Sequence, residues 1–263
     1  MQIVAQDNIK LTDDVDWFSS DGVTSLNNEF VNIFKKYNLE SVFSSTVSED
    51  GNSIIIKNVN VDFYMSISIE KYSNNYLRLV PKYTSGSMIS DRSTNPQSVY
   101  LTSNKYINIH IVCVDDTLQY ISLYMYDSVN YSKVSSFDTL ETDCISYGYL
   151  KDVNDEIYEL SKYLSNKIEN GTSNVGSYMI TSYYDNYLDN YSYSNISKDE
   201  GMCSLLKLKI YYTTKYSNYN IIVKSEVKNT FFVQGDTLII NNIYNINNDK
   251  YIAIYPNVLC KLI

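Results

Sequence analysis

The sequence predicts an α+β protein that is rich in β structure, built from two antiparallel-sheet units that are each preceded by one amphipathic helix. Three observations lead to this prediction. Ile and Tyr, which favour strands, number 28 each, whereas only 2 of the 263 residues are Ala. Several segments alternate between apolar and polar residues, and two segments carry apolar residues at helical spacing. Their order, helix then strands and again helix then strands, places the units at residues 1–135 and 136–263.

The first predicted helix runs from Thr24 to Tyr37. Thr24 or Ser25 is suited to cap its start, and Glu29 follows near the first turn, where an acidic side chain interacts favourably with the helix dipole. The apolar residues of this segment share one face of the helix: Leu26, Phe30, Ile33, Phe34 and Tyr37. We therefore expect this face to pack on a sheet.

The strands of the first unit are predicted from alternation and from turn residues. Residues 59–70 alternate strictly, and a turn after them leads into a returning strand at residues 76–82, which predicts a hairpin. A polar stretch from Thr84 to Ser98 is predicted to be a long loop. Residues 106–114 and 118–126 form a second predicted hairpin around Asp115 and Asp116.

The second unit is predicted to begin with a helix at residues 153–168. Asp152 is its expected N-cap and Gly171 its expected end. A short strand is expected at residues 178–181. The β pattern then returns in segments separated by Asn-rich turns, with strands predicted at residues 205–213, 219–227, 230–233, 237–240 and 251–255.

Charge and hydropathy exclude several classes of protein. The net charge of −9 and the pI near 4.6 argue against specific nucleic-acid binding. The longest apolar runs are far too short for a transmembrane helix, so we expect no membrane insertion. Residues 1–10 contain neither a basic segment nor an apolar one, which predicts no signal peptide.

No residue pattern indicates catalysis, a cofactor or a metal, so we expect a protein that is not an enzyme. The only His, His110, lies on the polar side of a predicted strand and is expected at the surface or at a sheet edge. Pairs of acidic residues such as Asp115–Asp116 and Asp155–Glu156 are expected to form turns and caps. Four widely spaced Cys are expected to be reduced and structural: Cys113, Cys144, Cys203 and Cys260.

The composition and the C-terminal strands resemble virion structural proteins of AT-rich tailed bacteriophages. The similarity rests on the Tyr, Asn, Ile and Lys content, on the strand-rich halves, and on the tracts at residues 234–240 and 250–255. It implies a non-enzymatic neck or tail ring subunit, or a capsid auxiliary protein, present in multiple copies. The implied partners are copies of the chain and neighbouring virion proteins, and the implied location is the virion, assembled in the host cytoplasm.

The predicted interaction surface is the Tyr-rich segment from Ser182 to Tyr193, together with the loop at residues 84–98. The alternatives are that the segment packs on the sheet of its own unit and that the loop is mobile and solvated. Tyr is favoured at protein interfaces, and Arg suits a carboxylate on a neighbouring subunit. The candidate interface residues are Tyr184, Tyr187, Leu188, Tyr191 and Arg92. One alternative is a capsid decoration or a receptor- or carbohydrate-binding module that uses exposed Tyr. A second is an enzyme that uses acidic side chains.

Overall fold

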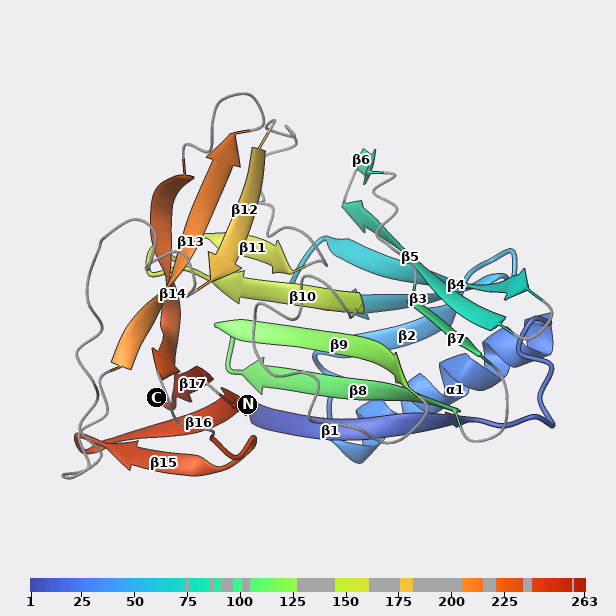
Figure 1. Cartoon of the computed structure of the whole chain (residues 1–263), viewed down its shortest axis with the longest axis horizontal. Helices are drawn as coiled ribbons and strands as arrows, with labels where there is room; N and C mark the ends of the chain where they lie inside the picture. The colour runs from blue at the N-terminus through green and yellow to red at the C-terminus, as the bar shows by residue number, and fades with distance from the viewer. Residues whose placement is uncertain are drawn as a thin grey trace.

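The strands of the computed structural model form three antiparallel sheets, which we call A, B and C (Figure 1). The structure describes residues 1–73, 76–85, 88–90, 97–100, 105–126, 145–160, 176–181, 205–214, 221–233, 238–256 and 258–263. Within these ranges it contains one helix. The β-rich α+β fold is therefore confirmed, whereas two sheet units with one helix each do not describe the observed arrangement.

Sheet A is the middle layer. Across the sheet its strands are β1 (Gln2–Leu11), β8 (Lys105–Val114), β9 (Leu118–Tyr126), β10 (Ile145–Lys151) and β11 (Ile157–Leu160). The predicted hairpin around Asp115 and Asp116 is confirmed as β8 and β9. β1, which pairs with β8 along its whole length, was not predicted. Adjacent apolar residues in β1 break the alternation that signals a strand with one solvated face.

Sheets B and C lie on either side of sheet A. The strands of sheet B are β2 (Phe43–Val47), β3 (Ser53–Asn58), β4 (Phe63–Ser73), β5 (Tyr76–Ser85) and β6 (Met88–Ser90), with β7 (Gln97–Tyr100) also paired to β5. The strands of sheet C, in order across it, are β12 (Gly176–Thr181), β13 (Leu205–Thr214), β14 (Ile221–Val233), β17 (Val258–Lys261), β16 (Asp249–Tyr255) and β15 (Ile243–Ile246).

The first predicted helix is confirmed but begins earlier than expected. Helix α1 (Ser20–Lys36) is capped by Ser19, whose side chain accepts a hydrogen bond from the backbone N–H of Gly22. The start is fixed by a turn at Asp16, which lies so close that a Cβ on Gly22 would stand 2.3 Å from the Asp16 carbonyl oxygen. The acidic residue in the first turn of the helix is Asp21, whereas Glu29 was predicted to lie near the first turn.

The predicted second helix is wrong at residues 153–160, and residues 161–168 lie outside the described part of the chain. Residues 153–156 form a turn, in which the Asp152 carboxylate accepts hydrogen bonds from the backbone N–H of Asn154 and Glu156. Asp155 has φ of 62°, which is incompatible with a right-handed helix. Ile157 then opens β11, opposite Lys151. The helical spacing of the apolar residues is thus coincidental, since Val153 is 49% exposed.

Two boundaries in the first unit also differ from the prediction. Residues 59–62 form the turn between β3 and β4, and Val59 is 58% exposed, so the alternating segment becomes a strand only from Phe63. The polar stretch at residues 84–98 contains β6 and the start of β7. At the first place a turn interrupts a segment that alternates like a strand, and at the second place strands form in a segment whose polar composition predicts a loop.

In the C-terminal part, the strands predicted at residues 219–227 and 230–233 are one strand, β14, with a left-handed residue at Asn229 (φ 53°). Residues 238–240, predicted to be a strand, form a loop that leads into β15. The hairpin of β15 and β16 turns at Asn247 and Asn248. Both have positive φ, as the two central residues of a type I′ turn require.

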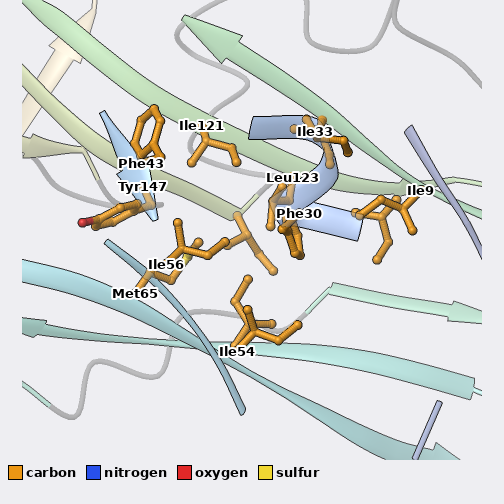
Figure 2. Packing of buried hydrophobic residues seen from close by; sticks show 14 of the residues in the cluster. Ile9, Phe30, Ile33, Phe43, Ile54, Ile56, Met65, Ile121, Leu123 and Tyr147 are labelled. Atoms are coloured by element: carbon orange, nitrogen blue, oxygen red, sulfur yellow. The ribbon is translucent and has the colours of Figure 1, made fainter. Parts of the chain in front are cut away.

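The largest core cluster lies between sheets A and B, with α1 packed against β1, β2 and β3. Figure 2 shows Phe30 and Ile33 of α1 beside Ile9 of β1 and Leu123 of β9. Aromatic rings continue this core, since Phe43 of β2 stacks on Phe34 of α1 with centroids 5.8 Å apart. Because burial of apolar surface stabilises by about 25 cal/mol per Å², this large cluster contributes strongly to the stability of this half.

Buried Tyr hydroxyls tie sheet A to sheet B. The Tyr147 hydroxyl of β10 accepts a hydrogen bond from the backbone N–H of Asn58 and donates one to the carbonyl of Phe63, both at 2.7 Å. In the opposite direction, the Tyr83 hydroxyl of β5 donates to the carbonyl of Ser146. These bonds satisfy backbone groups at sheet ends that would otherwise be buried without a partner.

A second core cluster lies between sheets A and C. It joins Val112, Leu118 and Leu150 of sheet A to Ile254 and Tyr255 of sheet C. Sheet A therefore contains strands from both sides of residue 135 and packs against a sheet on each face. The division of the chain into domains at residue 135 stays a prediction.

Candidate functional site

The five predicted interface residues lie outside the part of the chain whose side chains are described. Tyr184, Tyr187, Leu188 and Tyr191 fall within residues 182–204, and Arg92 falls within residues 91–96. Their interface role therefore stays a prediction. The described residues contain two other unusual features: a buried polar row on sheet A and an open strand at the edge of sheet C.

The buried polar row crosses the face of sheet A that is turned toward sheet C. Gln6 of β1 pairs with His110 of β8, His110 pairs with Ser122 of β9, and Ser122 pairs with Ser146 of β10, so that the four side chains follow one line across the sheet. Asn108 lies in the next row. His110, Ser122 and Asn108 are fully buried. These polar groups are far apart in the sequence, and the register of the strands brings them together.

His110 is therefore a core residue, and the expectation of a surface or edge position is wrong. Its ring stands edge-on to Tyr255 of β16, with centroids 5.1 Å apart, and edge-on to Tyr120 of β9, with centroids 6.1 Å apart. The two Tyr rings are nearly parallel to each other. Sheet C covers this face of sheet A, which is why a polar residue on an alternating strand is buried.

Several polar atoms of this row and of the neighbouring Asn108 make no hydrogen bond in the described part of the chain. They are both ring nitrogens of His110, both side-chain polar atoms of Asn108, the Ser122 hydroxyl and Nε2 of Gln6. Burial lowers the pKa of His110 to about 3, so its imidazole is neutral at physiological pH. The neutral imidazole of His110 cannot form an ion pair. Because the side chain is fully buried, it also cannot contact a substrate in solution.

The described thiols are similarly unreactive. Cys113 and Cys260 are free and buried, and burial raises the pKa of each to about 12. This agrees with the predicted structural role for these two residues, while Cys144 and Cys203 lie outside the described ranges. In the described ranges, no group of three or more His, Cys, Asp or Glu side chains could hold a metal ion.

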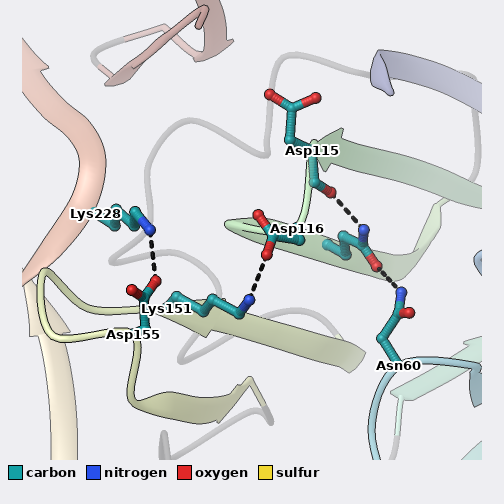
Figure 3. A network of polar contacts seen from close by, with 7 residues as sticks. Asn60, Asp115, Asp116, Lys151, Asp155 and Lys228 are labelled. Atoms are coloured by element: carbon teal, nitrogen blue, oxygen red, sulfur yellow. Dashed lines mark hydrogen bonds and ion pairs between the residues drawn. The ribbon is translucent and has the colours of Figure 1, made fainter.

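The acidic pairs in the described ranges lie in turns, as predicted, and bind lysines and amides that join the sheets (Figure 3). Asp116 pairs with Lys151, whose hydrogen bond lowers the pKa of the carboxyl group. Asp155, beside β11, pairs with Lys228 of sheet C. Gln119 links the turn at Asp115 to Asn60 of sheet B. The Asp155 carboxylate thus connects sheet A to sheet C, whereas the contact toward sheet B runs through the Gln119 amide and the backbone carbonyl of Asp115.

The second unusual feature is the edge of sheet C. Strand β15 is the last strand of this sheet and pairs only with β16 in the described structure (Figure 1). Ile243 is 59% exposed, and Ile239, four residues earlier around a turn, is 65% exposed. Residues 239–248 contain only Ile, Asn and Tyr, without a charged residue or a proline. Uncharged, apolar edge strands of this kind readily pair with another strand.

The edge strands β1 and β2 are covered by contrast. Helix α1 contacts the edge strands β1 and β2. Tyr37 at its C-terminal end donates a hydrogen bond to the backbone carbonyl of Gln6 on β1, and Ser45 of β2 bonds Asn27 of the helix. Helices and charges are the usual ways in which proteins block an edge, so β15 is the candidate functional surface.

No family model matches the chain, and a search of curated proteins returns no match. In the described residues, no helix is long and apolar enough to cross a membrane.

Proposed function

We propose that this protein is a non-enzymatic structural subunit of a phage particle, a neck or tail ring component that is present in multiple copies. Its partners would be copies of itself and neighbouring virion proteins, and its location the virion, assembled in the host cytoplasm. The phage assignment comes from the resemblance in composition. The assembly role has support from a surface feature of the molecule.

The observation that carries the assembly role is the open edge of β15. A protein with a net charge of −9 repels its own copies over most of its surface. Residues 239–248 form an uncharged strip within that surface, and Ile239 and Ile243 expose apolar side chains there. A soluble subunit keeps such a strip when another chain covers it in the assembled state.

The contacts between the sheets also support this role. Asp152 pairs with Val227 of sheet C in a β-bridge, and the N–H of Val153 bonds the carbonyl of Glu226. Together with the Tyr147 bonds to sheet B, these contacts connect all three sheets through backbone groups. Contacts of this kind limit the conformational entropy that a subunit loses when it joins a particle.

The alternative of a decoration or receptor-binding module that uses exposed Tyr has no specific support in the described residues. Every Tyr whose side chain is described is buried or half-buried. Several of them, such as Tyr147 and Tyr255, lie in the cores between the sheets, and the Tyr147 hydroxyl bonds backbone groups there. The Tyr excess of the sequence is thus at least partly a property of the core.

The test of the proposed function is the copy number in solution and in a particle. Sedimentation velocity over a wide concentration range, with negative-stain electron microscopy of the same samples, should show a closed oligomer of fixed size. A chain that stays monomeric at every concentration and is absent from particles produced by its source would contradict the proposal. Binding to a host surface polymer by the isolated monomer would instead favour the receptor-binding alternative.

A further inference from the structure

The backbone of β15 offers a definite set of hydrogen-bonding groups at the open edge. Ile246 and Asp249 flank the two-residue turn of the hairpin, so this pair and the pair of Tyr244 and Tyr251 exchange hydrogen bonds between β15 and β16. The alternation of an antiparallel ladder then directs the N–H and carbonyl groups of Ile243 and Asn245 away from β16. The bond from the N–H of Leu262 to the carbonyl of Lys250 confirms this alternation, since it shows that Lys250 faces β17.

We propose that β15 pairs with β15 of a second copy of this chain, antiparallel, around a two-fold axis at Tyr244. This inference rests on the proposed function and names the partner of this one edge. Because a two-fold contact closes on itself, a ring would join such pairs through a further surface. In this register Ile243 of one copy lies opposite Asn245 of the other, and each such pair exchanges two backbone hydrogen bonds. All outward-facing backbone groups of the strand are then satisfied on both copies.

Other two-fold registers satisfy fewer groups. If Ile243 faced its own copy, Asn245 would lie opposite Asn241, which has φ of 70° and is outside the strand. The register centred on Tyr244 also places the two Tyr244 rings directly opposite each other. Cross-strand aromatic pairs of this kind stabilise antiparallel sheets. The Tyr244 hydroxyl already accepts a hydrogen bond from the N–H of Ile239, so the ring is held in place before pairing.

The absence of charge at this edge suits a second, like-charged copy as its occupant. Two identical chains each carry a net charge of −9, so they can approach closely only where no like charges meet. The ten residues 239–248 meet this condition. The exposed Ile243 would then lie beside Asn245 of the other copy and lose much of its contact with water.

Disulfide trapping tests the register directly. Two single variants, Ile243→Cys and Asn245→Cys, are mixed in equal amounts under mild oxidation, and the linked peptides are identified by mass spectrometry. Opposite residues in a hydrogen-bonded antiparallel pair have Cα atoms about 5.5 Å apart, within disulfide reach. The heterodimer linked from residue 243 to residue 245 should therefore exceed either homodimer several-fold. The matched control is Val59→Cys, because Val59 is equally exposed but lies in the turn between β3 and β4.

A charge at the edge tests the same contact without a cross-link. Ile243→Lys should shift the oligomer toward smaller species in sedimentation, whereas Val59→Lys should leave it unchanged, with both melting temperatures near that of the parent. Equal amounts of all three cross-linked products, or a dominant homodimer, would overturn the register. An oligomer that persists in Ile243→Lys without the heterodimer would overturn the edge contact and leave the proposed function standing.

Discussion

The two faces of sheet A are equally buried but differ in chemistry. On β8, Ile107, Ile109 and Ile111 point to sheet B and α1, while Asn108 and His110 point to the side of sheet C, and all five are fully buried. The face toward sheet B is covered by α1 and by strands whose apolar residues are recognisable in the sequence. The second face is closed in part by C-terminal strands such as β16. Polar alternation thus predicts solvent exposure only for a sheet with a single covered face.

The largest loss of stability is expected from a substitution on the apolar face of sheet A, which packs on sheet B. Leu123→Ala removes a fully buried side chain of β9 from the core between sheets A and B. The free energy of unfolding should fall by about 2–5 kcal/mol, from lost burial and from the cavity that remains. Chemical denaturation with urea measures this loss. A change below about 1 kcal/mol would show that this core is loosely packed.

The polar face should make the protein sensitive to acid. His110 has a pKa of about 3 in the folded state, below the value of 6.5 for an unperturbed His. Above pH 6.5 the ring is neutral in both states and has no effect. As the pH falls from 6.5 toward 3, only the unfolded chain binds the proton, so stability is lost. At pH 4.5 this loss is about 2–3 kcal/mol.

The control for this acid effect is His110→Leu, which removes the titrating group. Its stability should fall less between pH 7 and pH 4.5 than that of the parent, since only the carboxylates still titrate. Parallel losses in the two proteins, measured by denaturation at both pH values, would show that His110 is not held neutral in the core.

Removal of the Tyr147 hydrogen bonds between sheets A and B should lower the stability by a smaller amount. Tyr147→Phe keeps the ring but removes the hydroxyl that bonds Asn58 and Phe63, which leaves a buried backbone N–H without its partner. We expect a loss of about 1–3 kcal/mol in the free energy of unfolding. Tyr158→Phe is the matched change, because the hydroxyl of Tyr158 bonds the half-buried Glu156. A larger loss in Tyr158→Phe would contradict this account.

The smallest effect on stability is expected at Ser122, the neighbour of Leu123 on β9. Ser122→Ala removes a buried hydroxyl that has no hydrogen-bond partner in the described structure. Stability should stay unchanged or rise by up to about 1 kcal/mol, because no bond is lost and a desolvated polar group is removed. A loss comparable to that of Leu123→Ala, in the same urea titration, would mean that the hydroxyl has a partner.

Local patterns predicted the elements whose structure depends on neighbours in sequence. The apolar stripe from Leu26 to Phe34 folds as a helix, and the alternation in residues 106–126 folds as a hairpin. The candidate edge of sheet C was recognisable only in part. The Asn-rich turns were predicted, but the strand between them was missed, because four residues with two Ile show no clear alternation.

The sequence by itself determined that the chain is β-rich, which turns its Asn and Asp residues form, and which face of α1 is apolar. These properties follow from backbone preferences and from spacing within one element. Only the tertiary structure decided that residues 157–160 extend sheet A as a strand, that β1 lies beside β8, and that His110 is enclosed beside Tyr120 and Tyr255. Each of these outcomes depends on partners that are distant in the sequence. Pairing and burial against such partners override local propensity, because they decide where the backbone hydrogen bonds and the apolar surface are satisfied.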